Sequence, residues 1–259
     1  MVQSVQRAAR ILRELSTSGP RLGVTELAAR LGVSKPTVHA LLRTLESEGL
    51  VRQEKGTSKY LLGPALLRLG NSYLATQELR SRSAGRADSL AESTGETVWV
   101  AVLDGDRHVL VVHHAFRHGN GLQILELGAT IPWNTCALGK ALVSFLPRER
   151  QEEMLRGELA RLTGKSVTDP DVLTEQLTRT RQTGYALEDQ ESVLGEAGIA
   201  SPVFDHSGDP VGSIGVIGPV ERILSEENRL RHAAAVRDAA TLLSRELGAG
   251  RGIAWRVTD

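Results

Sequence analysis

Residues 24–51 read VTELAARLGVSKPTVHALLRTLESEGLV, and this stretch decides the fold of the first part of the chain. Thr25 is a good N-cap for a short first helix, and Gly32 suits the left-handed position that ends such a helix. Ser34 has the side chain and the place to cap a second helix directly afterwards. Two short helices joined by so tight a turn predict a helix-turn-helix over residues 24–43.

The second helix has two faces of different character. Its inward face is apolar and consists of Val38, Leu41, Leu42 and Leu45. Its cap and outward positions are basic, hydroxyl-bearing or small, and they are Ser34, Lys35, Thr37, His39, Ala40 and Arg43. Side chains of these types bond phosphates, read base edges or contact a thymine methyl group. We therefore predict that these six residues contact double-stranded DNA.

The flanking segments complete a winged helix-turn-helix. Before it, one amphipathic helix carries apolar residues at helical spacing: Val5, Ala8, Ile11, Leu12 and Leu15. After it, two short strands around Gly56 predict a hairpin wing, with Lys55 and Lys59 placed for phosphate contact. Residues 1–60 carry ten Lys or Arg against five Asp or Glu, a surplus of five positive charges in a chain whose net charge is zero. A basic N-terminal segment followed by an acidic remainder favours a polyanionic partner for that segment, although surface charge also clusters by chance.

Composition bounds the class of protein. The chain has 259 residues, 41% of them hydrophobic and 24% charged, which is typical of globular proteins, and this length favours two compact units over one. No apolar run reaches the roughly 18 residues of a membrane span, and the N-terminus does not resemble a secretory signal. Cys136 is the only cysteine, which excludes an internal disulfide. These features predict a cytoplasmic protein without a membrane partner.

The remainder of the chain predicts a helix followed by an α+β domain. Gly63-Pro64 opens a helix that runs, with breaks allowed, toward Ser93. Three strands are then expected, at 97–103, 108–114 and 122–127, followed by a loop over 128–134 and a helix capped by Thr135. Later segments alternate between helices and apolar strands, and Ser225 caps a long terminal helix. The predicted organisation is a DNA-binding head (1–63), a linker helix (64–79), an effector-binding domain (80–250) and a flexible tail (251–259).

Six motifs spread along the chain are Gly32–His39, Tyr60–Gly63, Gly128-Ala129-Thr130-Ile131-Pro132, Ala137-Leu138-Gly139-Lys140-Ala141, Gly184-Tyr185-Ala186 and Gly212–Pro219. On these motifs the chain resembles the IclR family of bacterial transcription regulators, over about residues 4–248. Within the family the chain is most similar to regulators of glycerol operons. The segments that carry this closer similarity are Val111–Arg117, Leu125–Gly128 and Leu247–Arg251.

The resemblance implies a GAF-like effector domain, homodimers that often pair into tetramers, and DNA affinity altered by a small metabolite such as glycerol or glycerol phosphate. Matching the family's pocket position by position points to Ile131, Ala137, Leu138, Asp189, Gly198, Gly215 and Ile217, and Trp133 either lines the pocket or belongs to the core. Family members that bind small acids can carry hydroxyls where this chain has Gly215 and Ile217. This departure argues against a small carboxylate effector.

Other chemistries receive less support from the residues. His113, His114, His118 and Cys136 are metal-ligand types, but adjacent residues on a strand point to opposite faces and do not easily share one ion. The sequence shows no general base next to Cys136 that could activate its thiol as a nucleophile. The acidic residues Glu188, Asp189 and Glu191 form either an acid/base pair or a solvated turn with one member facing the pocket. We predict no catalytic residues, metal or cofactor, and the remaining alternatives are a small-molecule enzyme or an adaptor whose head does not bind DNA.

Overall fold

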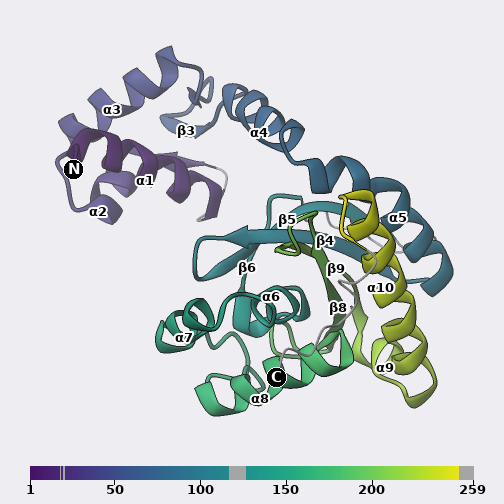
Figure 1. Ribbon diagram of the computed structural model, residues 1–259. Coiled ribbons are helices and arrows are strands. Elements are labelled where there is room, and N and C mark those ends of the chain that lie inside the picture. The colour runs from purple at the N-terminus through teal and green to yellow at the C-terminus, as the bar shows by residue number, and fades with distance from the viewer. Residues whose placement is uncertain (18, 20, 117–126, 251–259) are drawn as a thin grey trace. The chain divides into compact units, whose positions relative to one another are not determined.

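The structure is a computed structural model, which describes residues 1–250 except 18, 20 and 117–126 (Figure 1). Its contacts divide the chain into two compact units, Met1–Thr76 and Gln77–Asp259, and each is described by itself. The predicted strand at 122–127 and the tail at 251–259 lie largely or wholly outside the described residues. The predicted α+β class with a helix-turn-helix head is confirmed.

The first unit is a winged helix-turn-helix. Its elements are α1 (Gln3–Thr17), β1 (Leu22–Gly23), α2 (Val24–Leu31), α3 (Lys35–Ser47), β2 (Val51–Gln53), β3 (Lys59–Leu62) and α4 (Ala65–Ala75). The three strands form an antiparallel sheet in the order β1-β3-β2. The hairpin of β2 and β3 is the predicted wing.

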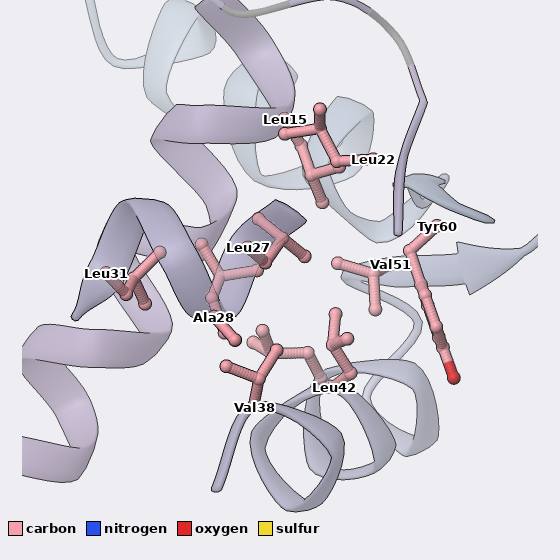
Figure 2. Packing of buried hydrophobic residues seen from close by; sticks show 11 residues of the cluster. Leu15, Leu22, Leu27, Ala28, Leu31, Val38, Leu42, Val51 and Tyr60 are labelled. Carbon is pink, nitrogen blue, oxygen red and sulfur yellow. The ribbon is translucent and has the colours of Figure 1, made fainter. Parts of the chain in front are cut away.

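One apolar cluster holds the head together. Side chains from α1, α2, α3 and the small sheet converge in it, as Figure 2 shows for Leu27, Val38, Leu42 and Val51. Leu27, Val38 and Leu42 are fully buried. Burying a Leu or Val side chain contributes about 1.5–3 kcal/mol, so this cluster fixes how α3 is held.

The caps of α2 and α3 differ partly from the prediction. Thr25 is not the N-cap of α2, which begins at Val24 with Gly23 as its cap. The reason is that Gly23 is held extended by pairing with Lys59, and its amide donates to Glu26 Oε2 at 2.7 Å. At α3 the prediction is confirmed, because Ser34 Oγ accepts the Thr37 amide.

The second unit is built on a six-stranded antiparallel sheet in the order β6-β5-β4-β9-β8-β7. Its strands are β4 (Thr97–Asp104), β5 (His108–Ala115), β6 (Thr130–Pro132), β7 (Ala186–Asp189), β8 (Glu196–Phe204) and β9 (Pro210–Pro219). Its helices are α5 (Glu78–Thr94), the 3-10 turn Trp133–Thr135, α6 (Ala137–Val143), α7 (Arg148–Arg156), α8 (Pro170–Thr183), α9 (Val220–Ile223) and α10 (Glu226–Glu246). Helices α5 and α10 cover one face of the sheet, and α6 packs on the other (Figure 1).

The stretch from Pro64 toward Ser93 is two helices, within the breaks that the sequence allowed, because Gln77 is extended and separates α4 from α5. Two local expectations in the second unit are corrected. The predicted loop over 128–134 contains β6, which pairs with β5. Thr135 does not cap α6, because its hydroxyl donates to the Pro132 carbonyl, and the Cys136 sulfur accepts the Gly139 amide in its place.

Candidate nucleic-acid interface and ligand cavity

The outward face of α3 is open to solvent. Lys35, His39, Ala40 and Arg43 are exposed, while Val38 on the opposite side is fully buried. The burial of the leucine side fixes the rotation of the helix, so the polar side must face outward. The geometry thus brings these four predicted contact residues together on one accessible face.

The two hydroxyl residues of this face are also part of the helix cap. Ser34 is exposed and Thr37 is half-buried, and their hydroxyl oxygens lie 2.8 Å apart. Ser34 Oγ also accepts the Thr37 amide, so the conformation of the first turn of α3 is fixed in the absence of DNA. A preformed turn lowers the entropic cost of presenting its side chains to a ligand.

The wing carries two further exposed cations, Lys55 and Lys59. Its base is tied to the rest of the head by an ion pair between Arg21 and Glu54 at 3.0 Å. Among the described residues, no salt bridge includes Lys35, Arg43, Lys55 or Lys59. Their charges are therefore not neutralised within this part of the structure.

The second unit contains a cavity of about 380 Å³ on the α6 side of its sheet. Five of the predicted effector residues line it, and these are Ile131, Ala137, Leu138, Gly198 and Ile217. The other lining residues are Trp99, Ala129, Thr130, Cys136, Glu188, Ser192, Val193, Glu196, Ile199, Ala200 and Val216. A cavity of this size takes a small ligand, and most of its wall is apolar.

Three predicted effector residues are absent from this lining. Trp133 is 1% exposed and packs in a separate apolar cluster with Leu173 and Leu177. Asp189 is exposed, and the Lys165 ammonium lies 3.3 Å from its carboxylate. Gly215 has no room for a side chain, because a Cβ there would lie 2.6 Å from the Ile199 carbonyl oxygen. Its role is to let β8 and β9 pack closely.

Of the neighbouring acidic residues Glu188, Asp189 and Glu191, it is Glu188 that lines the cavity, and not Asp189 as predicted. Successive side chains of β7 alternate between faces, so Glu188 shares the inner face with buried Ala186. Its Oε1 accepts the amides of Glu191 at 2.7 Å and Ser192 at 3.2 Å. Burial raises the pKa of the Glu188 carboxyl to about 7, and the two amides only partly oppose this.

A buried ion pair stands behind this carboxyl. The Lys140 ammonium of α6 lies 2.6 Å from Glu191 Oε1, and the two side chains are only 1% and 6% exposed. Lys140 is part of a family motif to which the sequence assigned no role, and neither of the two sequence interpretations of Glu191, an acid/base pair or a solvated turn, includes this ion pair. The helical spacing that puts Lys140 among apolar residues was the signal that it is buried.

Cys136 is held as an unreactive thiol. It is buried, its sulfur accepts the Gly139 amide, and burial raises the pKa of the thiol to about 12. A thiol that stays protonated at neutral pH is a poor nucleophile and a poor metal ligand. This environment argues against the alternative in which Cys136 attacks a substrate.

The histidine pair of β5 is closer together than expected. The rings of His113 and His114 lie 6.4 Å apart between centroids, in a strand whose register with β4 shifts between Val100 and Ala101. His118 lies outside the described residues. Within the described part of the chain, no group of three or more His, Cys, Asp or Glu side chains is placed to hold a metal ion.

Comparison with known proteins finds a family match for the helix-turn-helix part of the chain and another for the part that contains the cavity. Residues 4–55 match the family profile of the IclR helix-turn-helix domain, and residues 71–245 match that of the C-terminal domain of bacterial transcriptional regulator IclR. None of the described helices is long and apolar enough to cross a membrane.

Relatives match over most of the chain. A glycerol operon regulatory protein of Streptomyces griseus is 44% identical over 251 residues, which cover 96% of this chain and 98% of the relative. The transcriptional repressor IclR of Escherichia coli is 30% identical, over 87% of this chain and 83% of the relative. The crystal structure of an IclR transcriptional regulator from Alicyclobacillus acidocaldarius has a TM-score of 0.82 at 28% identity, over 95% of this chain and 98% of that one. The chain belongs to the IclR family of bacterial transcriptional regulators.

Proposed function

We propose that this protein is a homodimeric repressor of a catabolic operon, and that a small metabolite bound in the cavity releases it from its operator. The observation that carries the proposal is the exposed face of α3, whose basic and small side chains lie opposite a fully buried apolar side. The similarity to glycerol operon regulatory proteins supports a glycerol-utilisation operon as the target, with glycerol or glycerol phosphate as the metabolite.

In this proposal a dimer places two α3 helices in successive major grooves of a near-palindromic operator. Contacts to bases and nearby phosphates come from Ser34, Lys35, Thr37, His39, Ala40 and Arg43. Lys55 and Lys59 of the wing contact phosphates, which position the protein without specifying sequence. Pairing of dimers into tetramers would join two such operator sites.

A ligand bound in the cavity would control the affinity of the protein for DNA. Its proposed contacts are Ile131, Ala137, Leu138, Gly198 and Ile217, together with Glu188. A ligand shifts DNA affinity only if it binds one arrangement of the two heads better than another. The role of this cavity is binding rather than catalysis, and the protein works in the cytoplasm, where the operator is.

A gel-shift titration tests the proposal. Duplex DNA from upstream of a glycerol-utilisation operon should be bound more tightly than a shuffled duplex of the same length. Adding the metabolite should release it. Equal affinity for the two duplexes, or binding that no glycerol metabolite alters, would contradict the proposal.

A further inference from the structure

The charged side chains in the described cavity wall are both carboxylates. Among the described lining residues, Glu188 and Glu196 are the only charged ones, and no Lys or Arg is present. A ligand carrying a carboxylate or phosphate would therefore meet negative charge without a compensating cation. Such repulsion is strongest at buried Glu188 and is screened by solvent at exposed Glu196.

Lys140, a buried cation next to Glu191, already has an anionic partner. The Lys140 ammonium pairs with Glu191 Oε1 and lies 3.5 Å from the Leu187 carbonyl oxygen, and its side chain is 1% exposed. Glu191 Oε2 is buried without a hydrogen-bond partner among the described residues, so Lys140 does not fully satisfy even this carboxylate. When Glu188 is ionised, the trio of Glu188, Glu191 and Lys140 carries one net negative charge.

Two backbone donors at the cavity wall are already used by the protein itself. Consecutive amides that point to one spot are a common anion-binding device in proteins. Here the amides of Glu191 and Ser192 both donate to Glu188 Oε1. The carboxylate of the protein itself occupies the place of an anionic ligand.

The second oxygen of Glu188 is left to accept from a ligand. Oε2 forms no hydrogen bond with the described residues, and it lies 3.5 Å from where a Cβ on cavity-lining Gly198 would stand. The side chain as a whole is 4% exposed. A buried acceptor beside a cavity is satisfied by a hydrogen-bond donor from whatever fills that cavity.

We propose that the cavity binds an uncharged polyol of the glycerol class, that one ligand hydroxyl donates to Glu188 Oε2, and that carboxylated and phosphorylated derivatives are excluded. This inference rests on the proposed function and chooses between the two metabolites that it allows. The hydroxyls of Thr130 and Ser192 line the same cavity and offer further partners to a polyol, while Ile131, Leu138 and Ile217 contact its carbon skeleton.

A charge series on one carbon skeleton tests the inference. Isothermal titration of the full-length protein at pH 8, where Glu188 is mostly ionised, with glycerol, glycerate and glycerol 3-phosphate should show saturable binding of glycerol. Glycerate and glycerol 3-phosphate should bind at least tenfold more weakly. This comparison uses only the unmodified chain, so it does not depend on how any variant folds.

Two neighbouring substitutions then locate the contact. Glu188→Gln keeps an oxygen for the amides of Glu191 and Ser192 but removes the charge, and it should weaken glycerol binding at least tenfold, because hydrogen bonds to charged groups are the stronger ones. Asp189→Asn makes the same chemical change one residue further on, at a side chain outside the cavity, and should leave glycerol affinity within twofold.

The outcomes separate this inference from the function on which it rests. Tighter binding of glycerol 3-phosphate or glycerate than of glycerol, or no binding of glycerol at all, would overturn the inference. So would an unchanged glycerol affinity in Glu188→Gln. A parallel gel shift with the same protein decides the function independently, because operator binding that glycerol 3-phosphate releases would leave the repressor intact while refuting the uncharged ligand.

Discussion

The face of α3 and the cavity of the second unit place their charged groups in opposite ways. On α3 and the wing, cationic side chains are exposed and form no salt bridge with the described residues. In the cavity wall, Glu188 is buried and held by two amides, and behind it Lys140 is buried against Glu191. The first arrangement suits a large polyanion, and the second suits a small ligand recognised by a directed hydrogen bond.

This contrast has an energetic consequence. An exposed cation contributes little to folding, so it is free to contribute to binding, where each neutralised phosphate releases counterions. A buried charge has lost its hydration and needs its partner in the folded state itself. Removing a cation should therefore damage binding at the first site and stability at the second.

The largest effect is expected from Lys140→Met. The substitution leaves the Glu191 carboxylate buried without its partner, so the second unit should lose about 3–5 kcal/mol of unfolding free energy. Urea denaturation followed by tryptophan fluorescence reports on this unit, because Trp99 and Trp133 both lie in it. The matched control is Arg107→Ala, which removes the exposed pair with Glu158 and should cost less than about 1 kcal/mol. Equal losses in the two variants would refute the contrast.

The next effect is a pH dependence of stability. Because burial raises the pKa of Glu188 from 4.5 to about 7, the folded state holds this proton more tightly than the unfolded state does. The resulting stabilisation is complete below pH 4.5 and is lost as the pH rises through 7. Glu191 and Lys140 act on the same carboxyl, which in turn acts on Cys136, and the effect of burial remains the largest.

Denaturation of the wild type and of Glu188→Gln at several pH values between 5 and 8 measures this effect. The wild type should lose about 1–3 kcal/mol more than the variant across that range. Parallel curves for the two proteins would show that Glu188 titrates normally in the folded state.

At the DNA-binding face, Arg43→Ala should lower operator affinity by about 1–3 kcal/mol if Arg43 reads a base, with no loss of stability. The control is Arg82→Ala, which removes an exposed arginine of α5 in the second unit. Fluorescence anisotropy with a labelled operator duplex measures both. Unchanged affinity in Arg43→Ala would remove this residue from the proposed contacts.

The smallest effect is expected from Lys59→Ala in the wing. A lysine that contacts only phosphate should weaken operator and non-specific DNA by a similar factor. The plot of log K against log salt should become shallower by about one unit. A loss confined to the operator sequence would instead mean that Lys59 contributes to base recognition.

The head was predictable from sequence because its signals are local. The cap Ser34, the turn glycine Gly32 and the apolar spacing of α3 act within a few residues, and the structure confirms them. The cap of α2 was missed because it depends on Gly23 pairing with Lys59, a contact 36 residues away along the chain. No local pattern carries such information.

The cavity was predictable only in part for the same reason. Residues on α6 and on the neighbouring strands were found through the family resemblance, but the choice between Glu188 and Asp189 depends on the phase of a four-residue strand. A shift of one residue in such a strand exchanges its two faces. The pair of Lys140 and Glu191 joins residues 51 apart in the chain, so it becomes visible only in three dimensions.

Entry of the outward face of α3 into a groove of DNA can be detected with an Ala40→Cys variant. Ala40 is exposed at the middle of that face, and the native Cys136 is buried with its pKa raised to about 12, so an iron-chelate cleavage reagent should label position 40 selectively. The labelled protein should cut an operator duplex at two clusters of bases about one helical turn apart. Wild-type protein treated with the same reagent should not cut. Binding of the labelled protein without any cleavage would show that this face of α3 does not enter a groove.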